Sequence, residues 1–272
     1  MYKLIALDMD GTLLNENKEI SKANYNAIQE AKKNGFKVVL ATGRPLVGVK
    51  KFLEELELIS DNDYVVAFNG ALVQTTKSKR VVSQTTLTLD DYKELYEISK
   101  EYNVNIHALT KDDVIAPKNS KYTQVEADLN GIDIRIIPVE EVSKDEVIVK
   151  VMFIDEPELL DNIIERLPQN IKEKYTIVKS APFFLEFLDK SVNKGDGVSK
   201  IAKELNIKKE EIICVGDAGN DAAMIEYAGL GVAMGNAFEE IKEMADYITL
   251  SNEEDGVCHV IKKFMLKNEE IA

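Results

Sequence analysis

The chain has 272 residues, enough for one large domain or two modest ones, and 45% of them are hydrophobic, which excludes an intrinsically disordered protein. Acidic residues outnumber basic ones by 48 to 34, giving a formal net charge of −14. This charge argues against nucleic acid and against an anionic membrane surface as partners, because both attract basic surfaces. The two cysteines, Cys214 and Cys258, fit no metal or redox spacing, and no apolar run approaches the length of a transmembrane helix. We therefore expect a cytoplasmic protein.

Short apolar runs alternate with amphipathic segments at both ends of the chain. Near the N-terminus this pattern predicts strands at residues 4–7, 37–40 and 64–68, and helices at residues 21–34, with Ser21 as N-cap, and 46–56. After residue 190 it predicts helices at residues 196–205, 221–227, 239–244 and 257–266, and strands at residues 212–215 and 230–234. Such alternation is typical of a parallel sheet covered on both faces, so the two ends should form one Rossmann-like α/β domain.

The middle of the chain has a different pattern. Residues 71–74 and 80–85 alternate in polarity around a Lys-Ser-Lys turn, which predicts a hairpin. Between residues 86 and 189 we expect helices at 90–102 and 156–164 and strands at 147–153 and 184–188. This mixture predicts an α+β domain inserted into the first one. The chain then divides into a core of residues 1–85 and 190–272 and an insert of residues 86–189.

The strongest chemical signal is the segment Asp-Met-Asp-Gly-Thr at residues 8–12, directly after the first strand. Because alternate side chains of a strand share a face, Asp8 and Asp10 should point the same way. They would lie at the carboxyl end of a parallel strand, where open α/β sheets bind ligands. Two neighbouring carboxylates stay ionised only beside a cation, and Mg²⁺ would also polarise a phosphoryl oxygen. The alternative, a solvated acidic loop, is disfavoured by the apolar strand before the pair and the Gly-Thr after it.

Two further segments carry groups that bind anions. Thr42, Gly43 and Arg44 follow the second strand, where a hydroxyl and a backbone N–H at a helix N-terminus can donate to a phosphate. Lys194 comes just before the helix predicted from residue 196 and could act as a point charge for a phosphate. Each segment alone also fits a plain turn or a surface lysine.

A second acidic loop, Gly-Asp-Ala-Gly-Asn-Asp at residues 216–221, follows the strand predicted at residues 212–215. Asp217 and Asp221 would supply further hard oxygen ligands, and Asn220 an amide donor. Asp221 is also placed to be the N-cap of the following helix.

Taken in this order, the four segments resemble the haloacid dehalogenase (HAD) superfamily of phosphohydrolases. The flanking segments at residues 69–71, 193–195 and 233–237 are similar to its Cof-type members, and the insert falls where those members carry a C2-type cap domain. The resemblance covers essentially the whole chain. It implies a Rossmann-like core with an α+β cap, and a phosphatase that acts on small phosphorylated metabolites, above all sugar phosphates.

The resemblance also implies a role for each matching residue. Asp8 would be the nucleophile that forms an aspartyl-phosphate, and Asp10 the general acid and then the base. Mg²⁺ would be held by Asp8, the backbone carbonyl of Asp10 and Asp217, with support from Asp221. The groups expected on the phosphoryl oxygens are Thr42, Gly43, Lys194 and Asn220, while Arg44 would meet either the substrate or the surrounding structure.

The cap would close over the substrate and choose the leaving group. Its polar candidates are His107, Lys118, Tyr122 and Glu186, each of which also fits a structural or solvated side chain.

Two other functions stay open at this point. A phosphomutase would share the Asp-x-Asp core, and a non-catalytic metabolite-binding protein could use the same scaffold. The expected partner is a small phosphorylated metabolite in every case, and the chain could be a monomer or a homodimer.

Overall fold

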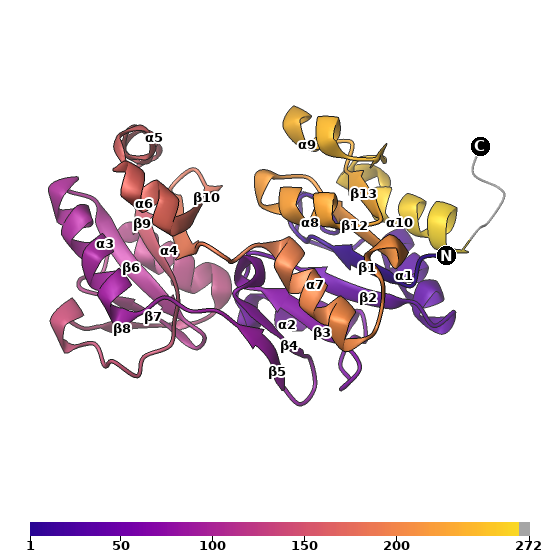
Figure 1. The fold of residues 1–272 in the computed structure, drawn as a ribbon, viewed down its shortest axis with the longest axis horizontal. Helices are drawn as coiled ribbons and strands as arrows, with labels where there is room; N and C mark the ends of the chain where they lie inside the picture. The colour runs from indigo at the N-terminus through magenta and orange to yellow at the C-terminus, as the bar shows by residue number, and fades with distance from the viewer. Residues whose placement is uncertain (267–272) are drawn as a thin grey trace. The chain divides into compact units, whose positions relative to one another are not determined.

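The computed structural model describes residues 1–266, which divide into two compact units (Figure 1). The first unit contains residues 1–43, 51–84 and those from 193 on, and the second contains residues 44–50 and 85–192. Across residues 1–266, no helix combines the length and the apolar character needed to cross a membrane.

One eight-stranded sheet with the order β14-β13-β12-β1-β2-β3-β4-β5 forms the centre of the first unit. Its strands are β1 (Leu4–Leu7), β2 (Lys37–Ala41), β3 (Tyr64–Ala67), β4 (Leu72–Thr75), β5 (Val81–Gln84), β12 (Ile212–Gly216), β13 (Leu230–Ala233) and β14 (Tyr247–Ile248). All neighbours from β14 to β3 are parallel, and β4 and β5 add an antiparallel hairpin. Leu4 of β1 is in register with Lys37 on one side and Ile212 on the other. The predicted Rossmann-like sheet, built from both ends of the chain, is therefore confirmed.

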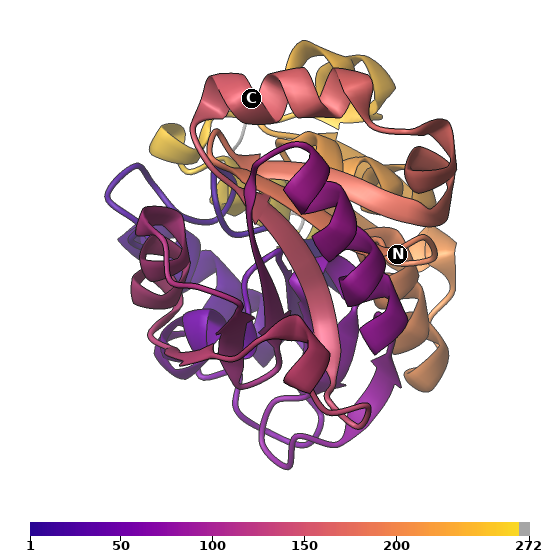
Figure 2. The same cartoon turned by 90° about the vertical axis from the view of Figure 1, so that its left-hand side faces the viewer.

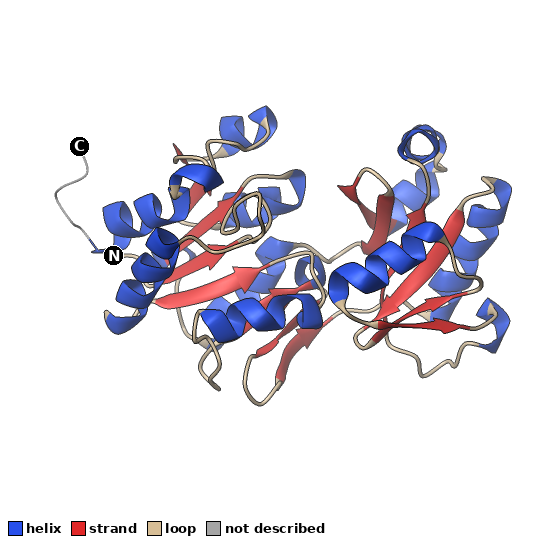
Figure 3. Cartoon of the chain, turned by 180° about the vertical axis from the view of Figure 1, so that it is seen from behind, coloured by secondary structure: helices blue, strands red, loops and turns tan. Residues whose placement is uncertain are grey.

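Helices cover both faces of this sheet, as Figures 1 and 3 show from opposite sides. They are α1 (Lys22–Lys33), α7 (Lys194–Glu204), α8 (Ala222–Tyr227), α9 (Glu239–Met244) and α10 (Gly256–Val260), with the later part of α2 (Leu46–Glu55). On one face, Val198 of α7 and Met224 of α8 pack with Ala6, Val39 and Val66 of the strands. The predicted cap at Ser21 is present, because its hydroxyl accepts the N–H of Asn24.

Some boundaries differ from the sequence-based prediction. Helix α7 begins at Lys194 rather than at residue 196, because Asn193 is extended and its side chain accepts the N–H of Asp196. The helix predicted at residues 257–266 is the short α10, followed by a π-helical segment, Ile261–Leu266. The short edge strand β14 has no counterpart in the prediction.

The second unit is α+β, with a six-stranded sheet in the order β10-β11-β9-β6-β7-β8. Its elements are α3 (Leu89–Glu101), β6 (Asn105–Thr110), β7 (Asp113–Ala116), α4 (Lys121–Asn130), β8 (Asp133–Ile136), β9 (Ile148–Ile154), α5 (Pro157–Arg166), α6 (Gln169–Lys174), β10 (Tyr175–Ala181) and β11 (Phe184–Asp189). Figure 2 turns this unit toward the viewer, with α3 lying across the strands. Tyr92 of α3 and Leu160 of α5 pack with Val151, Phe153 and Phe187 on one face of the sheet. Helices α4 and α6 are absent from the sequence-based prediction.

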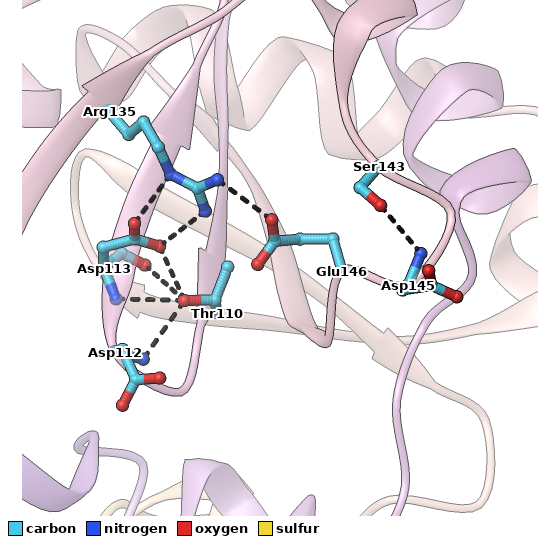
Figure 4. A network of polar contacts seen from close by, with 7 residues as sticks. All are labelled: Thr110, Asp112, Asp113, Arg135, Ser143, Asp145 and Glu146. Atoms are coloured by element: carbon cyan, nitrogen blue, oxygen red, sulfur yellow. Dashed lines mark hydrogen bonds and ion pairs between the residues drawn. The ribbon is translucent and has the colours of Figure 1, made fainter.

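A polar network fixes the parallel pair β7 and β8 at the edge of this second sheet (Figure 4). Arg135 of β8 pairs with Asp113 of β7 at 2.8 Å and with Glu146 at 3.0 Å. The Thr110 hydroxyl donates to the same Asp113 carboxylate at 2.7 Å. Asp113 thus links β8 to the turn between β6 and β7.

A glycine at the start of α7 lets this helix approach α8 closely. A Cβ added to Gly195 would lie 2.3 Å from the backbone oxygen of Ala223, so no side chain fits without a shift of one helix. We predict that Gly195→Ala lowers the free energy of unfolding by about 1–3 kcal/mol, the usual range for overpacking. Urea unfolding measures this loss. Gly219→Ala is the matched control, since a Cβ there meets nothing within 4 Å; equal losses for both variants would contradict the packing argument.

Candidate active site

A buried lysine joins two segments that lie far apart in the sequence. Lys194, the first residue of α7, has a side chain with no exposed surface. Its Nζ donates to Oδ1 of Asp8 at 2.5 Å and to Oδ1 of Asp221 at 2.6 Å. Asp8 follows β1 directly, and both carboxylates are buried. A buried ammonium stays protonated only beside such partners, so Lys194, Asp8 and Asp221 form one buried ion-pair cluster.

Asp221 stands at the N-cap position of α8, as predicted, but its side chain bonds elsewhere. Its Oδ2 accepts the backbone N–H groups of Asp217 at 3.0 Å and Ala218 at 3.1 Å. The backbone of Asp221 is already helical, with φ −92° and ψ −17°, whereas an N-cap residue is normally extended. The side chain therefore reaches back into the loop. Asp221 thus occupies the predicted N-cap position of α8, but its side chain accepts no bond from that helix and instead holds the loop after β12 closed.

Three carboxylates converge at the carboxyl end of the parallel strands. One oxygen from each of Asp8, Asp217 and Asp221 lies within 4.8 Å of the others. The Thr12 hydroxyl orients Asp217 by donating to its Oδ1 at 2.8 Å. Asp10 contributes no carboxylate oxygen to this group; its Oδ1 accepts from Lys18 at 2.9 Å. Hard carboxylate oxygens at this spacing are the donors that Mg²⁺ takes in proteins.

The electrostatics of the site favour a cation. Burial, reinforced by the charge of Asp221, raises the pKa of Asp8 well above its usual value, against the opposing effect of Lys194. Burial and Asp221 also raise the pKa of Asp217 to about 6. Burial disfavours the charged form of Lys194, but Asp221 and Asp8 outweigh it and raise its pKa. One ammonium thus leaves the carboxylates short of positive charge, and the donor set fits a divalent metal ion.

Asn69 lies beside the predicted phosphate-binding residues, although its segment was not among the predicted site residues. Its backbone N–H donates to the carbonyl of Thr42 at 2.9 Å, and its Oδ1 accepts from Nδ2 of Asn220 at 3.0 Å. A Cβ on Gly43 would lie 3.0 Å from the same Oδ1. Asn69 therefore brings Thr42, Gly43 and Asn220 together. Its φ of 56° is left-handed, and the Asn-Gly pair after a buried strand was the available signal.

Arg44 is grouped apart from its predicted neighbours. Thr42 and Gly43 belong to the first unit, whereas residues 44–50 belong to the second. Within that second unit, Nη1 of Arg44 donates to the carbonyl of Gly48 at 3.4 Å.

Three of the four cap candidates are built into the interior of the second unit. Burial lowers the pKa of His107 to about 3, with help from the charge of Lys150, so its imidazole is neutral. Glu186 is buried and pairs with Lys150 at 2.7 Å. The Tyr122 ring stacks on Phe183 with ring centres 5.0 Å apart. The fourth candidate, Lys118, is exposed.

Comparison with known proteins decides the family. The family model described as haloacid dehalogenase-like hydrolase matches residues 5–261. The chain belongs to this family. It is 46% identical over 268 residues to the Bacillus subtilis protein named "Putative phosphatase YxeH", covering 98% of this chain and 99% of the relative. It is 34% identical over 267 residues to the B. subtilis "5-amino-6-(5-phospho-D-ribitylamino)uracil phosphatase YcsE", covering 97% and 96%.

Solved structures of HAD-like hydrolases agree with this assignment. A haloacid dehalogenase-like hydrolase from Bacteroides thetaiotaomicron superposes with a TM-score of 0.86 at 32% identity, over 97% of this chain and 100% of that one. The HAD subclass IIB sugar phosphatase BT4131 superposes with a TM-score of 0.81 at 25% identity, over 96% and 98%. Together with the relatives named as phosphatases, these matches make the chain a HAD-like enzyme of the phosphatase class.

The raised pKa of Asp217 predicts a pH-dependent stability in metal-free buffer. Between the ordinary pKa of 3.8 and the folded-state value of about 6, the folded chain binds more protons than the unfolded chain. The free energy of unfolding therefore falls as pH rises through this window. We expect Asp217→Asn to remove about 1–3 kcal/mol of that fall between about pH 4 and about pH 7.

Urea unfolding at each pH in the presence of EDTA measures the effect. Asp112→Asn, which removes an exposed carboxylate of the second unit, is the control and should follow the parent chain. Parallel pH profiles for Asp217→Asn and the parent would contradict the raised pKa.

Proposed function

We propose that this phosphatase hydrolyses phosphate monoesters of small metabolites, sugar phosphates first, with Mg²⁺ and through an aspartyl-phosphate on Asp8. The observation that carries the proposal is the convergence of Asp8, Asp217 and Asp221, with Lys194 between Asp8 and Asp221. Likeness to a sugar phosphatase and to a phospho-ribitylamino-uracil phosphatase supports the substrate class.

The proposed reaction has two steps. A carboxylate oxygen of Asp8 forms a bond to phosphorus while the bond from phosphorus to the ester oxygen breaks, and Asp10 donates a proton to the departing oxygen. Water then attacks the phosphorus of the aspartyl-phosphate as Asp10 takes a proton from it. Phosphate leaves and Asp8 is regenerated.

The remaining residues are proposed to neutralise the phosphoryl group. A bound Mg²⁺ would supply positive charge for its oxygens, held by Asp8, the backbone carbonyl of Asp10 and Asp217, with Asp221 in support. The donors proposed for the phosphoryl oxygens are Thr42, Gly43, Lys194 and Asn220, with Arg44 as a further candidate. Fixed donors of this kind stabilise charge that develops in the transition state.

The proposal extends to the roles of the two domains, the location of the protein and its partners. Residues 1–85 and 190–272 would carry the chemistry, and residues 86–189 would choose the leaving group. The proposed partner is a small phosphorylated metabolite in the cytoplasm, without a nucleic-acid or membrane partner. Both a monomer and a homodimer are compatible with these roles.

Phosphate release tests the reaction. We expect the chain to release phosphate from hexose phosphates in the presence of Mg²⁺, and Asp8→Asn to lose at least about a thousandfold in rate, because no nucleophile remains. A panel of sugar phosphates, nucleotides and an aryl phosphate, with and without Mg²⁺, measures this. Activity that survives Asp8→Asn would contradict the mechanism. Conversion of one hexose phosphate into another isomer, without phosphate release, would instead identify a mutase.

Metal binding has a readout that needs no turnover. An ion that binds only the folded chain stabilises it by about 2.7 kcal/mol at a hundredfold excess over its dissociation constant. We therefore expect MgCl₂ to raise the melting temperature by several degrees, and Asp217→Asn to abolish most of this shift. Asp112→Asn is again the control and should keep the shift. An equal shift in all three proteins would place the ion elsewhere.

A further inference from the structure

The turn that follows the Asp-x-Asp segment carries a lysine aimed at the second aspartate. Nζ of Lys18 lies 2.9 Å from Oδ1 of Asp10, and the two side chains are 56% and 41% exposed. Lys18 adopts a left-handed backbone with φ 61°, which is uncommon for a residue other than glycine. The chain accepts this conformation at a position whose side chain meets Asp10.

The turn itself is held rigidly. The backbone N–H of Lys18 donates to the carbonyl of Asn15 at 2.9 Å. The Asn15 side chain accepts the N–H of Glu19 at 2.9 Å, and its backbone N–H donates to the Glu19 carbonyl at 3.1 Å. These bonds close residues 15–19 into a tight loop that fixes the point at which the Lys18 side chain leaves the backbone.

Side chains from a distant segment anchor residues 11–14, which connect Asp10 to this loop. Nδ2 of Asn236 donates to the carbonyl of Gly11 at 2.8 Å, and Nδ2 of Asn252 donates to the carbonyl of Leu14 at 2.9 Å. The two asparagines are themselves joined, since the N–H of Asn252 donates to Oδ1 of Asn236 at 3.0 Å. The segment between Asp10 and the Lys18 turn is therefore tied to the rest of the first unit.

Asp8 and Asp10 face different cations although they are two residues apart. Asp8 is buried against Lys194, whereas Asp10 meets Lys18 outside the group of converging carboxylates. Lys194 already serves two carboxylates, so an Asp10 side chain turned toward them would add a further negative charge to a site short of positive charge. Lys18 offers that carboxylate a separate partner.

We propose that Lys18 is a positioning residue for Asp10: it holds this carboxylate apart from the Asp8–Asp217–Asp221 group, where it can exchange a proton with the ester oxygen. The inference rests on the proposed function, in which Asp10 is the general acid. Lys18 touches neither phosphorus nor the metal in this assignment. Its effect passes through Asp10 alone.

A comparison of two esters with different leaving groups distinguishes a positioning role of Lys18 from a purely structural one. An alkyl phosphate departs as a strongly basic alkoxide and needs a proton, whereas p-nitrophenyl phosphate departs as a stable anion and needs little help. We expect Lys18→Met to lower kcat/KM about three- to fivefold for a hexose 6-phosphate, the size expected from an exposed ion pair. The value for p-nitrophenyl phosphate should change by less than about twofold, within the scatter of a surface substitution.

Three comparisons make the experiment specific. Lys18→Arg should restore most of the alkyl-phosphate activity, because it keeps the cation. Lys22→Met, which removes an exposed lysine at the start of α1, should behave as the parent chain does. Asp10→Asn should lower kcat/KM for the hexose 6-phosphate, relative to p-nitrophenyl phosphate, by a larger factor than Lys18→Met does. The double variant Asp10→Asn/Lys18→Met should have the same kcat/KM as Asp10→Asn alone.

The outcomes separate the two proposals. If the parent chain releases no phosphate, or if Asp8→Asn keeps the activity, the proposed function fails. If the parent is active and Asp10→Asn discriminates between the esters, but Lys18→Met lowers both equally or neither, the role of Lys18 is overturned. Loss for the alkyl ester alone, with rescue by arginine, supports it.

Discussion

The buried ion pairs of Lys194 are the constraint on which the rest of the site depends. Its ammonium has no exposed surface and meets Asp8 and Asp221 at 2.5 and 2.6 Å. Removing one partner of such a buried group typically destabilises a protein by about 3–5 kcal/mol, because a charge is left without compensation. The lysine therefore fixes where α7 can begin relative to β1 and to the loop after β12. Any arrangement that separates these three segments leaves a buried charge unpaired.

The segments around Lys194 approach one another because small residues allow it. Gly195 lets α7 lie against α8, and a Cβ on Gly70 would lie 2.2 Å from the backbone oxygen of Asn193. Gly11 has a φ of 83°, and a Cβ there would lie 2.4 Å from an oxygen of Asp217. Each of these glycines stands where a loop carrying a site residue passes another backbone or carboxylate. The glycines of the motifs are thus a condition for the carboxylates to converge.

Function and stability oppose each other in this cluster. Burial raises the pKa of Asp8 and of Asp217, so ionising them in the folded chain is unfavourable without a further cation. The same shortage of positive charge that destabilises the metal-free fold would favour the divalent ion that we propose for this site. In our proposal, Lys18 pairs with Asp10 and so keeps this carboxylate away from the other three. In the proposed mechanism, one segment of three residues then holds the nucleophile Asp8 in one environment and the proton donor Asp10 in another.

The sequence by itself determined the parallel sheet, most helix positions and the segments that we propose to carry the chemistry. Buried strands, helical spacing and caps such as Ser21 are local signals, which the chain expresses within a few residues. The helix α4 escaped prediction because its polar residues are buried by contacts outside the helix, as when Glu126 pairs with Lys150. The tertiary structure alone decided which charges meet. Lys194 and Asp8 are 186 positions apart, and Asn69 and Asn220 are 151 apart, so no local pattern could pair them. The same reason explains why the Asp221 side chain closes its own loop instead of accepting an N–H of α8. The partner of a polar group depends on which backbones are brought within hydrogen-bond distance, and that is a property of the whole fold.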